Sequence, residues 1–87
     1  MTRKISSAQM RAARAMLRWS ALDLALESKV GVATIRRVEV INGEIPVTAA
    51  NEAAIRRAFE AAGIEFIDEN GTGEGVRFRR PRRAKRK

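Results

Sequence analysis

Arginine is the residue type in this chain that is best suited to bind another molecule. Arg36 and Arg37 are adjacent, and a guanidinium group can hold a phosphate, or the O6/N7 edge of guanine, with two hydrogen bonds. The 87 residues include no cysteine and no histidine, so thiolate chemistry, the usual metal ligands and the usual general base are missing. The carboxylates that could do chemistry show no metal-ligand spacing with a nucleophile or a base: Asp23, Glu27, Glu60, Glu65, Asp68 and Glu69. We therefore expect a binding protein and no enzyme, with no metal and no cofactor.

The net charge of +8 is distributed unevenly along the chain. Residues 1–37 hold eight basic and two acidic residues, whereas residues 38–76 hold two basic and eight acidic residues. Residues 77–87 hold eight basic residues and no acid. This asymmetry predicts a side that faces a polyanion in the first half of the chain, and a separate basic arm at its end.

The apolar segments are short. The longest runs of apolar residues are only a few residues long, so we predict no membrane-spanning segment and no membrane partner. The first ten residues lack the apolar core of a signal peptide. Because the absence of cysteine fits a reducing compartment, we expect a cytoplasmic protein.

The spacing of apolar residues predicts four helices. They span residues 8–17 with Ser7 as N-cap, residues 21–28, residues 32–40 and residues 49–62. Four further residues mark helix ends: Ser20 and Asp23 as a capping box before the second helix, Thr48 as N-cap of the fourth, and Gly63 after it.

The segment 20–39 organises the rest of the chain. Its two short helices are joined by the turn 29–31, and the pair has the features of a helix-turn-helix, in which packed apolar residues hold one helix ready to enter the major groove of DNA. The inward residues would be Leu24, Ala25, Val30, Ile35 and Val38, with Ala25 as the small residue where the helices cross. The outer surfaces of the second helix of this pair would carry Val32, Ala33, Arg36 and Arg37.

After Gly63 the periodicity changes from helix to strand. Residues 64–67 and 76–79, with a Gly- and Asn-rich turn between them, predict a β-hairpin whose buried side carries Ile64, Phe66, Val76 and Phe78. A lone hairpin is marginal in water, so it must pack on the helices or on a partner chain.

The predicted fold class is mainly α: four to five helices, a C-terminal hairpin and a disordered basic tail. We divide the chain into a helix-turn-helix domain (1–63), a hairpin extension that is a candidate dimerisation element (64–79) and the tail (80–87).

These motifs resemble the lambda-repressor-like (Xre-type) helix-turn-helix family, in particular its small stand-alone bacterial members. The resemblance covers residues 5–78 and is carried, in this order, by RAARAMLRWS, DLA, VATIRRVE and IRRAFEAAGIEFIDENGTGEGVRF. It implies a sequence-specific transcriptional regulator that binds double-stranded DNA and is associated with the nucleoid when bound. The regulator would be a homodimer on a two-fold operator, reading the major groove with the helix 32–40.

The resemblance also implies roles for individual residues. The base contacts would come from Val32, Ala33, Arg36 and Arg37, with Arg36 carrying most of the specificity. The phosphate contacts would come from Arg3, Lys4, Arg11, Ser20, Lys29 and Thr34. Arg14 and Glu39 match a structural ion pair that ties the first helix to the third.

The sequence departs from the family at several positions. Lys29 stands where glycine is frequent, Gly31 stands at the usual serine cap, and Ala21 replaces a glutamine that touches DNA. Leu22 and Leu26 form an apolar pair at positions that are usually polar, and they belong either to a larger core or to a face for a protein partner. They support an alternative function: a protein-interaction module such as an antitoxin or an antiactivator, with DNA binding secondary or lost.

Overall fold

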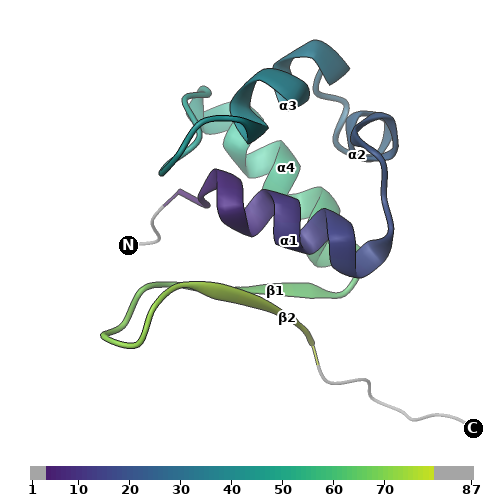
Figure 1. Ribbon diagram of the computed structural model, residues 1–87. Helices are drawn as coiled ribbons and strands as arrows, with labels where there is room; N and C mark the ends of the chain where they lie inside the picture. The colour runs from purple at the N-terminus through teal and green to yellow at the C-terminus, as the bar shows by residue number, and fades with distance from the viewer. Residues whose placement is uncertain (1–3, 80–87) are drawn as a thin grey trace, which may run out of the picture.

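Four helices followed by a two-stranded hairpin form the part of the chain that the computed structural model describes, residues 4–79 (Figure 1). The elements are α1 (Ser7–Leu17), α2 (Ala21–Ser28), α3 (Val32–Glu39), α4 (Ala49–Ala61), β1 (Ile64–Ile67) and β2 (Gly75–Phe78). The mainly α fold class is confirmed. Arg3 and the basic tail 80–87 lie outside the described residues. Within residues 4–79, no helix combines the length and the apolar character that crossing a membrane requires.

The start of α1 differs from the prediction by one residue. Its N-cap is Ser6 and not Ser7: the Ser6 hydroxyl accepts the backbone N–H of Gln9, and the Gln9 side chain accepts the backbone N–H of Ser6. Ser7 instead donates its hydroxyl to the carbonyl of Ile41. Both residues are serines, but only Ser6 has a glutamine three positions later, and that spacing completes the capping box.

The other helix ends agree closely with the sequence. Ser20 and Asp23 form the predicted capping box of α2, and Thr48 caps α4. The helices α3 and α4 end one residue earlier than expected, because the last predicted residue of each is the C-cap. Gly63, with a φ of 99°, follows α4 in the left-handed region that glycine adopts without strain.

The turn between α2 and α3 places a lysine in the left-handed region. Lys29 is the C-cap of α2 with φ 62° and ψ 26°, whereas Gly31, which precedes α3, has an ordinary φ of −57°. A side chain with a Cβ is strained in the left-handed region and glycine is not. Glycine, which the left-handed position 29 favours, is therefore found two residues later, at position 31.

We expect Lys29→Gly to raise the free energy of unfolding by up to about 1 kcal/mol, because it removes this strain. Urea denaturation followed by circular dichroism measures the change. The control is Glu27→Gly, inside α2, which should lower the free energy of unfolding by about 0.5–1 kcal/mol. A Lys29→Gly protein as unstable as the control would show that the lysine side chain contributes more than the strain costs.

Phe59 lies at the centre of a single core that joins the helices to the hairpin. It is fully buried, and its ring centre lies 5.7 Å from that of Trp19 and 5.8 Å from that of Phe66. The other buried apolar residues are Ile5, Met10, Ala13, Leu24, Ala25, Val30, Ile35, Val38, Ile45, Ile55, Ala58 and Ile64. The inward residues predicted for the segment 20–39 are all among them.

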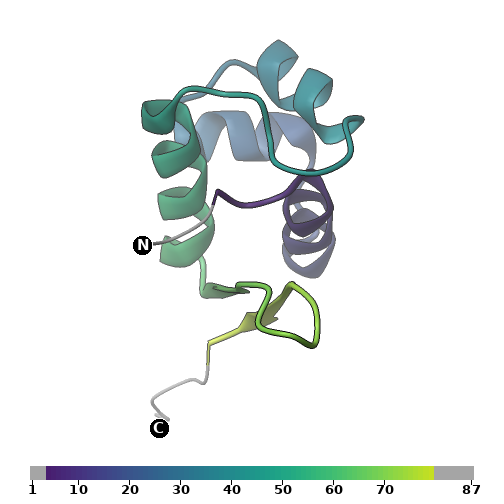
Figure 2. The ribbon, with the colours of Figure 1, turned by 90° about the vertical axis from the view of Figure 1, so that its left-hand side faces the viewer.

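The hairpin packs against two helices, with β1 next to α4 and β2 next to α1. Both helices stand on the same face of the hairpin when the molecule is seen from the side (Figure 2). The strands are antiparallel, with Ile64 opposite Phe78 and Phe66 opposite Val76. The Gln9 side-chain amide fastens the hairpin to α1, because Nε2 donates to the carbonyls of Ile67 and Gly75 at 3.1 and 2.9 Å.

Two predictions for the hairpin were wrong in detail. The second strand begins at Gly75 and ends at Phe78, one residue earlier than expected. Phe78 was expected on the buried side but is 52% exposed, whereas Ile64 is buried and Val76 is half-buried. Phe78 is the last residue of β2, whereas Val76, nearer the groove between α1 and β2, is partly covered.

Candidate nucleic-acid interface

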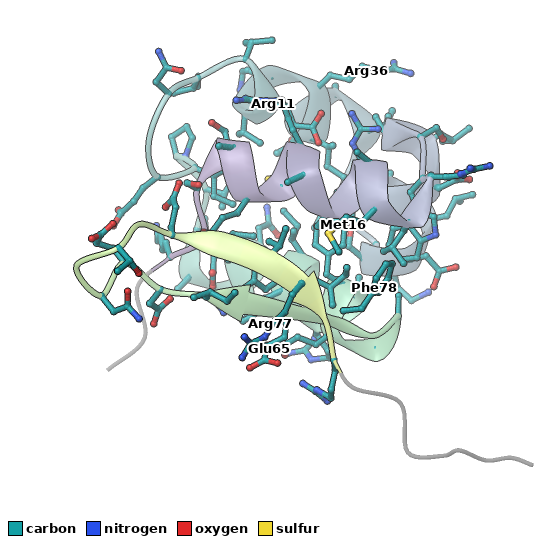
Figure 3. The ribbon with its side chains drawn as sticks, turned by 60° about the horizontal axis from the view of Figure 1, so that its bottom comes forward. Arg11, Met16, Arg36, Glu65, Arg77 and Phe78 are labelled. Carbon is teal, nitrogen blue, oxygen red and sulfur yellow. The ribbon has the colours of Figure 1, made fainter. Side chains whose placement is uncertain are left out.

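The helix α3 has one buried and one exposed face. Ile35 and Val38 are completely buried, whereas Ala33, Arg36 and Arg37 are exposed. Val32 and Thr34, in the first turn of the helix, are half-buried. Figure 1 places α3 at the side of the molecule away from the hairpin, and Figure 3 shows Arg36 pointing away from the body. The exposed face of α3 is therefore open to a large ligand.

An ion pair holds the C-terminal end of α3 against α1. Arg14 donates from Nε and Nη2 to the two carboxylate oxygens of Glu39, each at 2.7 Å, and from Nη1 to the carbonyl of Trp19 at 2.7 Å. Glu39 is 7% exposed, and its hydrogen bond raises the pKa of Arg14 above the ordinary value, although burial works against it. This is the pair that the family resemblance implied. It fixes α3 at a defined position relative to α1.

Arg36 and Arg37 are not occupied by contacts within the fold. The ion pairs within residues 4–79 join Arg14 to Glu39, Arg56 to Glu52 and Arg77 to Glu65. Neither Arg36 nor Arg37 makes a side-chain hydrogen bond or an ion pair in this part of the chain. Two guanidinium groups with all their donors free are thus carried by a helix whose other face is anchored.

The residues predicted to contact phosphates differ in their exposure and in whether their side chains already make hydrogen bonds within the fold. Lys29 is exposed at the turn, and Ser20 is exposed while its hydroxyl caps α2. Arg11 is exposed, but its Nη1 donates to the carbonyl of Glu39, so part of its guanidinium is used within the fold. Thr34 lies in the first turn of α3.

Lys4 lies in an unfavourable place for a phosphate contact. Its ammonium donates to the carbonyl of Val47 at 2.8 Å. It also lines a hollow of about 200 Å³ together with four carboxylate side chains, those of Glu44, Asp68, Glu69 and Glu74. These negative charges repel a phosphate. Within residues 4–79, no group of three or more histidine, cysteine or acidic residues is placed to hold a metal ion.

Leu22 and Leu26 belong to the surface and not to a larger core. Their exposed fractions are 52% and 67%. Leu24 and Ala25, on the same helix, are buried, so α2 uses its other face to pack. Of the two possibilities that the sequence left open, a larger core is therefore excluded for this pair.

Comparison of the chain with protein-family models, with curated proteins and with solved structures gave no match. Function is therefore inferred from α3 and the residues around it.

Proposed function

We propose that α2, the turn 29–31 and α3 form a helix-turn-helix, and that the protein is a sequence-specific DNA-binding transcriptional regulator that acts as a homodimer. One observation carries the proposal: α3 is anchored on one face by Ile35, Val38 and Glu39 and presents two unoccupied arginines on the other. An exposed helix of this kind fits the major groove of B-DNA.

In this proposal α3 lies in the major groove and Arg36 binds the O6/N7 edge of a guanine. Val32 and Ala33, at the start of α3, contact the methyl groups of thymines, and Arg37 contacts a base or the adjacent backbone. Ser20, Lys29 and Thr34 lie near the ends of α2 and α3, where phosphates flank the groove. Binding near a promoter would then block or recruit RNA polymerase.

The anchoring of α3 matters for specificity as much as the arginines do. A hydrogen bond to a base edge is directional and distinguishes bases only if the donor is held in place. The Arg14–Glu39 pair and the buried residues of α3 supply that rigidity, because they join the helix to α1 and to the core.

We expect Arg36→Ala to remove the preference for the operator. The loss of a bidentate contact costs about 1–3 kcal/mol, equivalent to about a 5- to 150-fold weaker affinity for the preferred sequence. Fluorescence anisotropy with DNA from upstream of the gene and with a scrambled duplex, across a series of salt concentrations, measures this. The matched control is Arg57→Ala, which removes an exposed arginine from α4 and should leave the preference unchanged.

Equal affinity of the original protein for both duplexes would contradict the proposal for this DNA. The salt series separates the two kinds of contact, because loss of a phosphate contact reduces the salt dependence for every sequence alike. Arg36→Ala should change the ratio of the two affinities, whereas a variant of a phosphate-binding residue should weaken both together.

The exposed leucines of α2 favour a second candidate function, a protein-interaction module. Leu22 and Leu26 are one helical turn apart and both are more than half exposed, which makes them a small apolar patch. Leu26→Glu should abolish a function that depends on this patch and leave DNA binding intact. Arg36→Ala should have the opposite effect.

A further inference from the structure

The strand β2 has a free edge. Arg79 donates its backbone N–H to the carbonyl of Gly63 at 2.7 Å, which marks these two residues as a hydrogen-bonded pair. Pairs alternate along an antiparallel ladder, so Glu65–Arg77 is the next pair of this kind, and the backbone groups of Val76 and Phe78 point away from β1. Within residues 4–79, no hydrogen bond to another backbone group uses these outward N–H and C=O groups.

The surface beside this edge includes several small apolar residues. A groove of about 180 Å³ runs between α1 and β2, lined by Ala8, Gln9, Ala12, Glu74, Gly75 and Val76. Ala8, Ala12 and Ala15 are exposed on α1, and Phe78 is 52% exposed at the end of β2. Beside β1 the surface is more polar, because the Arg56 guanidinium lies 5.4 Å from the ring centre of Phe66. An unpaired strand next to such a groove is a template for a further strand.

We propose that a second copy of this chain binds there, with the two β2 strands paired antiparallel into one four-stranded sheet. An edge strand is complementary to itself when a two-fold axis relates the two copies. Ala8 and Ala12 are small enough to let the α1 helices of the two copies approach each other above the joined sheet. The hairpin, marginal as an isolated pair of strands, then becomes part of a larger sheet.

The charges on β2 select the register of the pairing. If Arg77 faced its own copy, or faced Arg79, like charges would lie directly opposite each other, and such pairs are destabilising. With Val76 opposite Val76 of the second copy, Arg77 faces Gly75 and Phe78 faces Glu74. This register brings no two arginines together. A register centred on Gly75 also avoids that, but it would need Gly73, which has a φ of 103° in the turn, to continue the strand. We therefore centre the dimer on Val76.

This interface adds a dimer geometry to the proposed function. It rests on that function in assuming that the two α3 helices bind DNA. Antiparallel strands in one sheet are related by a two-fold axis perpendicular to the sheet. The helices of both copies therefore lie on the same face of the joined sheet. Because α3 lies on that side of the hairpin (Figures 1 and 2), both α3 helices face the same way, as a two-fold operator requires.

Cysteine cross-linking of the full chain tests the interface and its register, since the sequence has no cysteine of its own. In a hydrogen-bonded antiparallel pair the Cα atoms are about 5.5 Å apart, within the usual range for a disulfide. Val76→Cys should therefore form a covalent dimer under mild oxidation. Two controls should stay monomeric on a non-reducing gel: Arg77→Cys, whose two copies would lie diagonally at about 7–8 Å, and Val40→Cys, which is 81% exposed at the end of α3.

Sedimentation without DNA measures the oligomeric state, and the original protein should have twice the mass of one chain. Phe78→Glu, which would face Glu74 of the second copy, should reduce this to the mass of one chain. The matched control Leu22→Glu alters a residue with the same 52% exposure on α2 and should remain dimeric.

The proposal is overturned if the original protein is monomeric at every concentration, or if Val76→Cys cross-links no faster than Val40→Cys. It is also overturned if Arg77→Cys cross-links faster than Val76→Cys, because the register is then different. A dimer without DNA preference would refute the proposed function and leave this interface standing. A monomer with DNA preference would refute this interface and the proposed homodimer, and leave DNA recognition by α3 standing.

Discussion

Phe59→Ala is expected to lower the free energy of unfolding by about 3–5 kcal/mol, because it removes a fully buried aromatic ring and leaves a cavity. Phe59 packs against Trp19 in a stacked arrangement and against Phe66 edge to face. One substitution therefore loosens the contact of α4 with the end of α1 and with β1. Domains of this size have a total stability of about 5–15 kcal/mol, so this one substitution would remove a large share of it.

Urea denaturation of the two proteins measures this difference. The control is Leu26→Ala, which truncates another large apolar side chain that is 67% exposed, and should change the free energy of unfolding by less than about 0.5 kcal/mol. If both variants lost the same small amount, Phe59 would not be in the core. Phe59→Leu should lie between the original protein and Phe59→Ala, because it leaves a smaller cavity.

Arg14→Ala is the second large change, with an expected loss of about 2–3 kcal/mol. It removes both donors to the Glu39 carboxylate and the donor to the carbonyl of Trp19. The Glu39 side chain is 9% exposed, so its charge would be left largely without water or a partner. The Arg14 side chain is 23% exposed, and for this reason the expected loss is below that of a completely buried pair.

A double-mutant cycle with Glu39→Ala separates the pair from the other contacts of Arg14. We expect the double variant to be more stable than the sum of the single losses predicts, by about 0.5–3 kcal/mol. Additive losses would show that the two side chains are not coupled. Arg57→Ala, an exposed arginine on α4, is the control and should be within about 0.5 kcal/mol of the original protein.

The Arg14→Ala variant also tests the link between stability and function. Without the Arg14–Glu39 pair, hydrogen exchange at the backbone amides of α3 should become faster than in the original protein. Exchange in α4 should change less. If α3 is the reading helix, Arg14→Ala should also weaken operator binding although Arg14 itself is not among the proposed DNA contacts. Unchanged exchange in α3 would mean that the core alone holds this helix.

The positions of the helices in this protein are determined by interactions between residues that are close in the sequence. Capping boxes and apolar periodicity act over three or four residues, so the bounds of α2, the cap at Thr48 and the inward positions Ile35 and Val38 could be predicted from the sequence. The exposed positions of Arg36 and Arg37 follow from the same periodicity. The Arg14–Glu39 pair was implied by resemblance to a family and not by any local pattern.

Tertiary structure alone decided which charged groups are free and which surfaces stay open. Lys4 is bound to a carbonyl 43 residues away and lies near four acids, and Gln9 fastens a hairpin 58 and 66 residues away. Phe78 alternates with Val76 as a buried residue would, yet it is 52% exposed at the end of β2. Such partners are distant in the sequence, so no pattern within a few residues can specify them, whereas a helix and its caps are made from near neighbours.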